Sequence, residues 1–234
     1  MWFFDPMYFL FLAPAMLLAF WAQMRVKSTY AAASQHPASL TGAAAARHML
    51  DSAGLQSVAI EPIRGKLTDH YDPSARVLRL SEGVYGQRNL AAVGIAAHEA
   101  GHALQHAKNY APLTIRNLAV PAASFGSGIG MWSIMGGAIL TSQGAQSFGP
   151  MLISFGIAAF SAVVFFQLVN LPVEFDASNR AKAQLVEYGI VSEHDMGPVR
   201  KVLNAAGWTY VAATLQSVLT LLYLLMRFGG SSNE

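Results

Sequence analysis

Four long apolar stretches, separated by polar segments, dominate the pattern of hydrophobic and polar positions along this chain. They cover residues 7–24, 117–142, 150–171 and 208–226. Each stretch is long enough to cross about 30 Å of hydrocarbon as a helix. The pattern therefore predicts a mainly α, polytopic membrane protein with about four transmembrane helices.

The first apolar stretch resembles either a retained anchor or a cleaved signal peptide. A signal peptide carries its positive charge before the apolar core. Here the basic residues Arg25 and Lys27 follow the stretch, and none precedes it. We therefore predict that residues 1–24 are a retained N-terminal transmembrane anchor.

The polar segment 25–116 has the patterning of a small α+β unit. Residues 39–55 predict a helix with Ser39 or Thr41 as N-cap and Gly54 as its C-terminal stop. Alternating and β-branched positions predict strands at 57–63 and 75–81, separated by a turn-rich segment. A second helix is expected from about Tyr85 to Lys108.

The second polar segment, 172–207, is expected to be helical. Pro172 is favoured as the first residue of a helix, so we expect one to begin there. A break at Gly189 then separates it from a second short helix that leads into the last apolar stretch. The two polar segments are each small, so they are expected to fold against each other.

Composition narrows the chemistry that this chain can support. It is 53% apolar and 12% charged, with a net charge of +2, which gives no reason to expect a nucleic-acid partner. The absence of cysteine excludes disulfides and cysteine-ligated zinc. Any metal must therefore be bound by His, Asp or Glu.

The distribution of basic residues predicts the orientation in the membrane. Of fifteen Lys and Arg residues, ten lie in 25–116 and four in 172–207. Cytoplasmic loops carry an excess of Lys and Arg. Both polar segments are therefore expected in the cytoplasm, with the short turn 143–149 outside.

One motif, His98-Glu99-Ala100-Gly101-His102, carries recognisable chemistry. Residues i and i+4 of a helix project from the same face, so His98 and His102 can bind one Zn²⁺ from one side. The intervening Glu99 is then placed to deprotonate a water at the metal. The pattern predicts a catalytic zinc site that lacks a third ligand.

The third ligand is expected to be a His, Asp or Glu on the same side of the membrane. Glu174 is a candidate because we expect it in the first turn of the helix that follows the third apolar stretch. Carboxylates such as Glu174 and Asp176 are also common there simply because they stabilise the helix dipole. Position alone leaves both interpretations open.

The segments RLSEGVYGQRNLAAVGIAAHEAGHALQHA and NLPVEFDASNRA resemble the YugP-like neutral zinc metallopeptidases, a family of bacterial membrane peptidases. A more distant similarity links the chain to the HtpX/Ste24-type peptidases, whose later E-x-x-A-D motif supplies the third zinc ligand. The resemblance implies that His98, His102 and Glu174 bind zinc and that Glu99 is the general base. It also implies a small cytoplasmic, zincin-like catalytic unit at the inner (plasma) membrane.

The match departs from the HtpX/Ste24 motif at one position, where Ser178 replaces its Asp. The residue that supports the metal ligands is therefore open between Asp176 and Asn170. His70 is a possible transition-state donor, although a surface role explains it more simply. His106, one turn after His102, is better explained as a helix-end residue than as a further ligand.

The resulting hypothesis is a membrane-bound zinc metallopeptidase that hydrolyses peptide bonds with zinc-activated water. Its substrate would be a peptide or membrane protein near the lipid bilayer. An intramembrane peptidase of the site-2 type and a non-catalytic metal-binding scaffold are the alternatives. The expected divisions are an anchor at 1–24, a catalytic segment at 25–116, a membrane hairpin at 117–171, a helical segment with the third ligand at 172–207, and a last span with its tail at 208–234.

Overall fold

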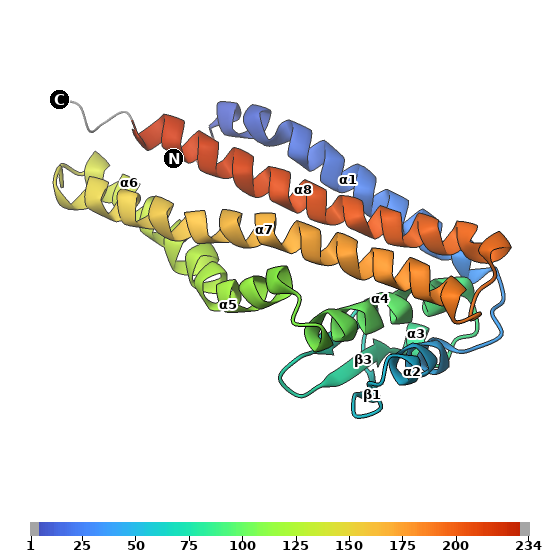
Figure 1. Ribbon diagram of the computed structural model, residues 1–234. Helices are drawn as coiled ribbons and strands as arrows, with labels where there is room; N and C mark the ends of the chain where they lie inside the picture. The colour runs from blue at the N-terminus through green and yellow to red at the C-terminus, as the bar shows by residue number, and fades with distance from the viewer. Residues whose placement is uncertain (1–4, 230–234) are drawn as a thin grey trace. The chain divides into compact units, whose positions relative to one another are not determined.

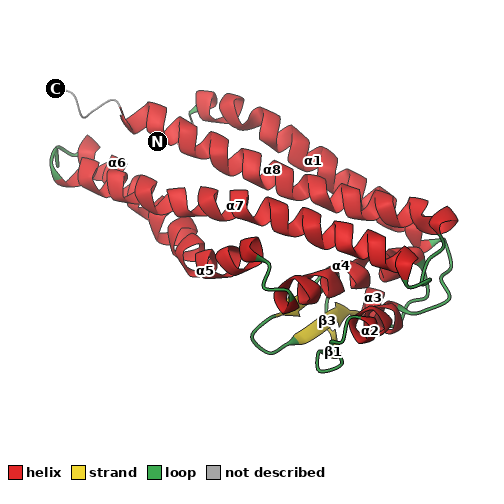
Figure 2. Cartoon of the chain, in the orientation of Figure 1, coloured by secondary structure: helices red, strands yellow, loops and turns green. Residues whose placement is uncertain are grey.

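Long helices form most of the chain in the computed structural model, which describes residues 5–229 (Figures 1 and 2). Four helical segments are long and apolar enough to cross a membrane, namely Pro6–Ser34, Ala111–Ser142, Phe148–Glu187 and Glu193–Phe228. The first is helix α1, and the third is helix α7. The second joins α5 (Ala111–Phe125), a π-helical turn (Gly126–Gly130) and α6 (Met131–Ser142). The fourth joins a short 3₁₀ turn (Glu193–Asp195) and α8 (Met196–Phe228). The predicted mainly helical architecture with four candidate membrane-spanning segments is confirmed.

The chain divides into two compact units. The membrane-helix unit contains Met1–Phe20, Ile115–Leu171 and Tyr210–Glu234. The site unit contains Trp21–Thr114 and Pro172–Thr209. Helices α1, α7 and α8 each contribute to both units, because they are longer than a membrane crossing requires.

Small residues allow close helix packing in the membrane-helix unit. A Cβ added at Gly126 would lie 2.1 Å from the carbonyl oxygen of Ala159 on α7, and one at Gly156 would lie 2.5 Å from that of Gly130. Large apolar side chains such as Leu17, Leu118 and Trp132 are exposed on this unit. Close backbone approach inside and apolar side chains outside are typical of helices in lipid.

Helix α7 continues without interruption through Pro172, so the prediction that a new helix begins there is wrong (Figure 1). A proline inside a helix removes one backbone hydrogen bond and strains the preceding turn. The helix tolerates this loss, with Val173 and Ala177 completely buried immediately after the proline. The predicted short helix before the last span is likewise the first part of the continuous α8.

The site unit contains the sheet and the helices packed on it. Strand β1 (Ala59–Ile63) pairs in parallel with β3 (Val77–Ser81), which pairs antiparallel with β2 (His70–Asp72), in the order β1-β3-β2. Helices α2 (Gly42–Ser52), α3 (Glu82–Tyr85) and α4 (Leu90–Ala107) complete this part of the chain. The side chains of α4 and α2 share one apolar core with the sheet and with the ends of α7 and α8.

Strand β2 lies in the segment that we expected to be only a turn. Asp69 and Asp72 give this segment its turn-like composition, and both carboxylates are used locally. Asp69 accepts hydrogen bonds from the backbone N–H and hydroxyl of Ser81. Asp72 accepts from the backbone N–H groups of Ser74 and Ala75. These contacts fix the two ends of a strand of only three residues.

The predicted helices of the site unit are present with shorter bounds. Thr41 is the N-cap of α2, because its hydroxyl accepts a hydrogen bond from the Ala44 N–H. The helix predicted to begin at about Tyr85 begins at Leu90, where Asn89 caps α4 by accepting from the Ala92 N–H. The earlier helical residues form the separate turn α3.

Candidate metal centre

Helix α4 presents both motif histidines on one face. His98 and His102 lie one turn apart, and their ring centroids are 4.8 Å apart. Both side chains are buried, with 9% and 7% of their residue surface exposed. Burial of two imidazoles is costly unless their nitrogens have partners, so the surroundings of these rings indicate their role.

The motif glycine brings α4 against α7. A Cβ at Gly101 would lie only 2.6 Å from the carbonyl oxygen of Ala177. Glycine is therefore required at this motif position for the two backbones to approach so closely. The contact places the histidine face of α4 beside the turn of α7 that contains Glu174.

Glu174 completes a group of three ligand atoms. Its Oε2 lies 3.3 Å from Nε2 of His98 and 3.6 Å from Nε2 of His102. Two ligands bound to tetrahedral zinc at about 2.0–2.1 Å are separated by about 3.3 Å, so this spacing fits the metal. The same Oε2 is buried without a hydrogen bond that satisfies it, as expected of an atom whose partner is a metal ion.

The electrostatics of the group favour a charged Glu174. Burial disfavours its carboxylate, but the attraction between that carboxylate and the imidazoles of His102 and His98 outweighs burial and holds the pKa of Glu174 well below its usual range. Burial also opposes protonation of His102, yet its interactions with Glu174 raise the pKa of that imidazole. A charged carboxylate between two imidazoles is a suitable donor set for Zn²⁺.

The second nitrogen of each histidine has its own partner. Nδ1 of His98 lies 3.0 Å from the Ser178 hydroxyl oxygen, and Nδ1 of His102 lies 3.0 Å from Oε1 of Gln105. Metal-binding histidines usually donate their other N–H to such a partner, which fixes the ring orientation. Both Nε2 atoms are therefore directed to the same point.

Gln105 connects His102 to α7 and is fully buried. Its amide nitrogen donates to the carbonyl of Val173 and to Oδ2 of Asp176, both at 2.8 Å. These two oxygens only accept, so the amide cannot be flipped and its oxygen must face His102. His102 consequently carries its hydrogen on Nδ1, which leaves Nε2 with a lone pair for a metal.

Glu99 is placed between the two histidines in sequence and is partly exposed. Its carboxylate forms no hydrogen bond or ion pair within residues 5–229. It is near enough to His102 to favour the charged form of that imidazole. A carboxylate beside the ligand group without a competing partner is available to accept a proton.

Comparison with known proteins supports the interpretation of this geometry. The family described as "Putative neutral zinc metallopeptidase" matches residues 8–229. The chain belongs to this family. It is also 48% identical over 231 residues to the "Putative membrane protease YugP" of Bacillus subtilis (strain 168), an alignment that covers 97% of this chain and 100% of the relative. No solved structure matches the chain.

In this member of the metallopeptidase family, the two residues predicted to support the ligands differ in whether they are connected to the ligand group. Asp176 supports the group through Gln105 and forms an ion pair with Arg180, whose Nε lies 2.5 Å from Oδ2. Asn170 is buried in the membrane-helix unit and has no side-chain hydrogen bond to any described residue. Of the two residues considered for support, only Asp176 is connected to the ligands.

The two remaining histidine candidates have local partners. His70 begins β2, and its Nδ1 lies 2.8 Å from the carbonyl oxygen of Thr68. His106 Nδ1 lies 2.9 Å from the Tyr71 hydroxyl. Burial raises the pKa of Tyr71, so its phenol stays protonated. Neither histidine belongs to the group of three ligand atoms.

Gln105 and Ser178 are the site residues that sequence reasoning did not assign. Gln105 lies three residues after His102, so both occupy one face of α4 and could have been paired from the helical period. Ser178 follows Glu174 by one turn on α7. Its contact with His98 depends on the distance between the two helices, which the sequence does not specify.

Proposed function

We propose that the chain is a membrane-bound zinc metallopeptidase that hydrolyses peptide bonds with Glu99 as general base. The observation that carries this proposal is the convergence of His98, His102 and Glu174 beside a carboxylate with no competing hydrogen bond. A site that only stored a metal would have no need of such a carboxylate.

The protein supplies the ligands, their orientation and a sheltered environment. Zinc held there would polarise a carbonyl and lower the pKa of water towards neutrality. Gln105 and Ser178 orient the two imidazoles, and Gly101 sets the distance between their helix and Glu174. These contacts preorganise the ligands, which limits the rearrangement needed during reaction.

Glu99 is proposed to move the proton. It accepts a proton from the attacking water as the new carbon–oxygen bond forms. It then donates that proton to the departing amine when the carbon–nitrogen bond breaks. A positioned general base of this kind contributes about 10²–10⁴-fold to a rate.

We place the catalytic unit on the cytoplasmic side of the membrane. The Lys and Arg residues gather in 25–116 and 172–207, which supports this orientation. An even number of spans between the two segments, here α5–α6 and α7, is consistent with a common side. Peptides and membrane proteins close to the bilayer are then the proposed substrates.

The orientation can be tested because the chain contains no cysteine. A Lys66→Cys variant carries one thiol in the exposed loop between β1 and β2. A membrane-impermeant maleimide is expected to label it in inverted vesicles and not in intact cells. Labelling in intact cells would reverse the proposed orientation.

An intramembrane peptidase is less well supported. Helix α4 is not one of the four segments identified as long and apolar enough to span. Fourteen of its eighteen residues are buried within the protein, packed with α2 and the sheet. A helix that is mostly buried in a core shared with another helix and a sheet is better explained as part of a folded unit outside the hydrocarbon.

Replacement of Glu99 by Gln tests catalysis separately from metal binding. The full chain in detergent should retain zinc, measured by elemental analysis, and lose at least about a hundredfold in cleavage of an unfolded protein. Glu187→Gln changes an exposed carboxylate in the last turn of α7 and should leave cleavage unchanged. Unaltered cleavage by Glu99→Gln would refute the mechanism, and zinc binding without cleavage by the unmodified chain would favour a scaffold.

A further inference from the structure

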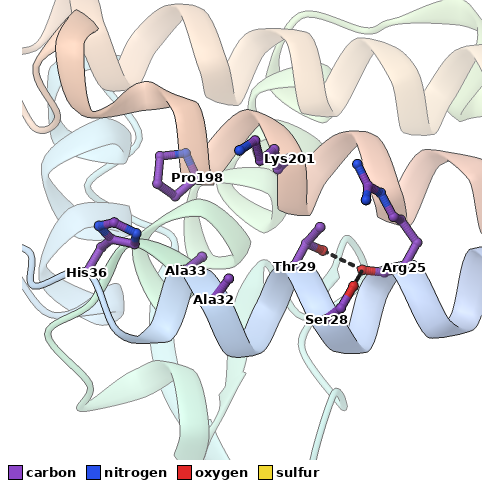
Figure 3. A pocket seen from close by; sticks show the side chains of 8 residues that line it. All are labelled: Arg25, Ser28, Thr29, Ala32, Ala33, His36, Pro198 and Lys201. Atoms are coloured by element: carbon purple, nitrogen blue, oxygen red, sulfur yellow. Dashed lines mark hydrogen bonds between the residues drawn. The ribbon is translucent and has the colours of Figure 1, made fainter.

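A pocket with basic side chains in its wall lies in the site unit, outside the metal centre. It has a volume of about 280 Å³ and is formed by the polar part of α1 and the first turns of α8 (Figure 3). Arg25 and His36 lie towards opposite ends of the α1 side, and Pro198 and Lys201 line the α8 side. None of these residues contributes to the metal centre.

The charge of this pocket is entirely positive or neutral. Arg25, Lys201 and His36 supply its basic groups, and no Asp or Glu lines it. Within the described part of the chain, neither Arg25 nor Lys201 forms an ion pair. Two cations in the wall of one pocket, without a counter-charge there, favour an anionic ligand.

The hydroxyl groups in the wall do not change this requirement. Ser28 and Thr29 both donate to the backbone carbonyl of Arg25, at 3.0 and 2.8 Å. Their protons are therefore engaged within α1, as the dashed lines in Figure 3 show. The donors that remain belong to the arginine, the lysine and the imidazole, so a ligand must offer several acceptor oxygens.

The position along α1 and α8 indicates where that ligand comes from. Trp21 on α1 and Trp208 on α8 contact each other edge to face, with centroids 5.7 Å apart. Paired tryptophans at the ends of apolar helices are typical of the membrane–water interface. Arg25 follows Trp21 by about 6 Å of helix, and Lys201 precedes Trp208 by about 10 Å.

The headgroup layer is about 5–8 Å thick on each side of the hydrocarbon, so both cations can reach it with their long side chains. We propose that this pocket binds the phosphate of an anionic phospholipid headgroup. Arg25 and Lys201 contact the phosphate oxygens, and the space lined by Ala32 and Pro198 accepts the polar part of the headgroup. The site would hold a lipid headgroup between α1 and α8. This proposal does not depend on the proposed peptidase activity.

The full chain in detergent can be tested with phosphatidylglycerol and phosphatidylcholine as probes. Native mass spectrometry should show selective retention of phosphatidylglycerol. Each basic residue near an anionic lipid contributes about fivefold to affinity, so Arg25→Gln/Lys201→Gln should weaken binding about 25-fold. Lys27→Gln/Lys66→Gln removes the same charge outside the pocket and should change binding less than about twofold.

A second variant tests the pocket without changing its charge. Ala32→Phe fills the space between the helices while both cations remain, and it should also reduce retention of phosphatidylglycerol. The charge-preserving variant Arg25→Lys/Lys201→Arg should retain it, and unchanged thermal unfolding will establish that each variant is folded. Equal retention of the two lipids, equal loss in the Lys27/Lys66 control, or displacement by soluble glycerol phosphate would overturn the proposal.

Discussion

Several polar side chains of the two units are satisfied in different ways. In the membrane-helix unit, hydroxyls such as those of Thr141 and Ser161 donate to carbonyls one turn earlier in their own helices. In the site unit, the buried polar groups connect different helices, as Gln105 of α4 does with Val173 of α7. Local hydrogen bonds satisfy a side chain, whereas bonds between helices also fix relative positions.

This difference indicates where substitutions should affect chemistry and where they should affect only stability. The candidate metal ligands come from two helices, so any change in the registry of α4 and α7 alters their spacing. The hydroxyls of Thr141 and Ser161 in the membrane helices can be lost without breaking a hydrogen bond to another helix.

Removal of the third ligand should have the largest effect. Glu174→Ala leaves two of the three proposed protein ligands, so zinc affinity should fall on the order of a thousandfold. Competition with a chelator measures this change, and Glu187→Ala on the same helix is the matched control. Unchanged zinc affinity would mean that another residue completes the site.

Loss of the connection between the helices should have the next largest effect. Gln105→Leu has similar volume but removes the bonds to His102, Val173 and Asp176, so zinc affinity should fall about 10–100-fold. Ser178→Ala removes one contact with His98 and should lie at the lower end of this range.

The control for Gln105→Leu is Gln184→Leu in the same unit. Oε1 of Gln184 is buried without a hydrogen-bond partner, so its removal should not reduce zinc affinity. If Ser178→Ala lowered zinc affinity more than Gln105→Leu did, the connection that Gln105 makes between α4 and α7 would not be the main support of the ligands.

The smallest effect on zinc affinity is expected when alanine replaces either of two glycines that make similar contacts in different units. Gly101→Ala pushes against Ala177 in the site unit, and Gly126→Ala pushes against Ala159 in the membrane-helix unit. Overpacking costs about 1–3 kcal/mol, so both should lower the thermal unfolding midpoint. Only Gly101→Ala should also lower zinc affinity, by up to about tenfold. An equal loss of zinc affinity in Gly126→Ala would remove the distinction between the units.

The sequence predicted the elements whose signals are local. The four apolar stretches, the cap of α2 at Thr41 (predicted as Ser39 or Thr41), and the i, i+4 spacing of His98 and His102 depend on neighbouring residues only. Glu174 was a candidate ligand from an expected helix start at Pro172 and was assigned by the family resemblance, and the expected helix start is wrong. The structure places Glu174 beside the histidines for another reason, the close contact of α4 with α7 at Gly101.

Features that depend on distant pairing were less accessible. Strand β2 has the composition of a turn and is ordered by its pairing with β3 and by Ser81. The role of Gln105 requires Val173 and Asp176, which lie 68 and 71 residues later in the chain. Neither relation has a periodic signal within its own segment.

The contribution of α4 and α7 to one metal centre has a consequence for biosynthesis. His98 and His102 precede the helices of two candidate spans, whereas Glu174 lies in the final part of the second of them. The ribosome therefore delivers two of the three proposed ligands well before the third, and a nascent chain that ends before Glu174 lacks the carboxylate. A zinc site with all three proposed protein ligands can form only after synthesis has passed through the intervening hairpin to Glu174.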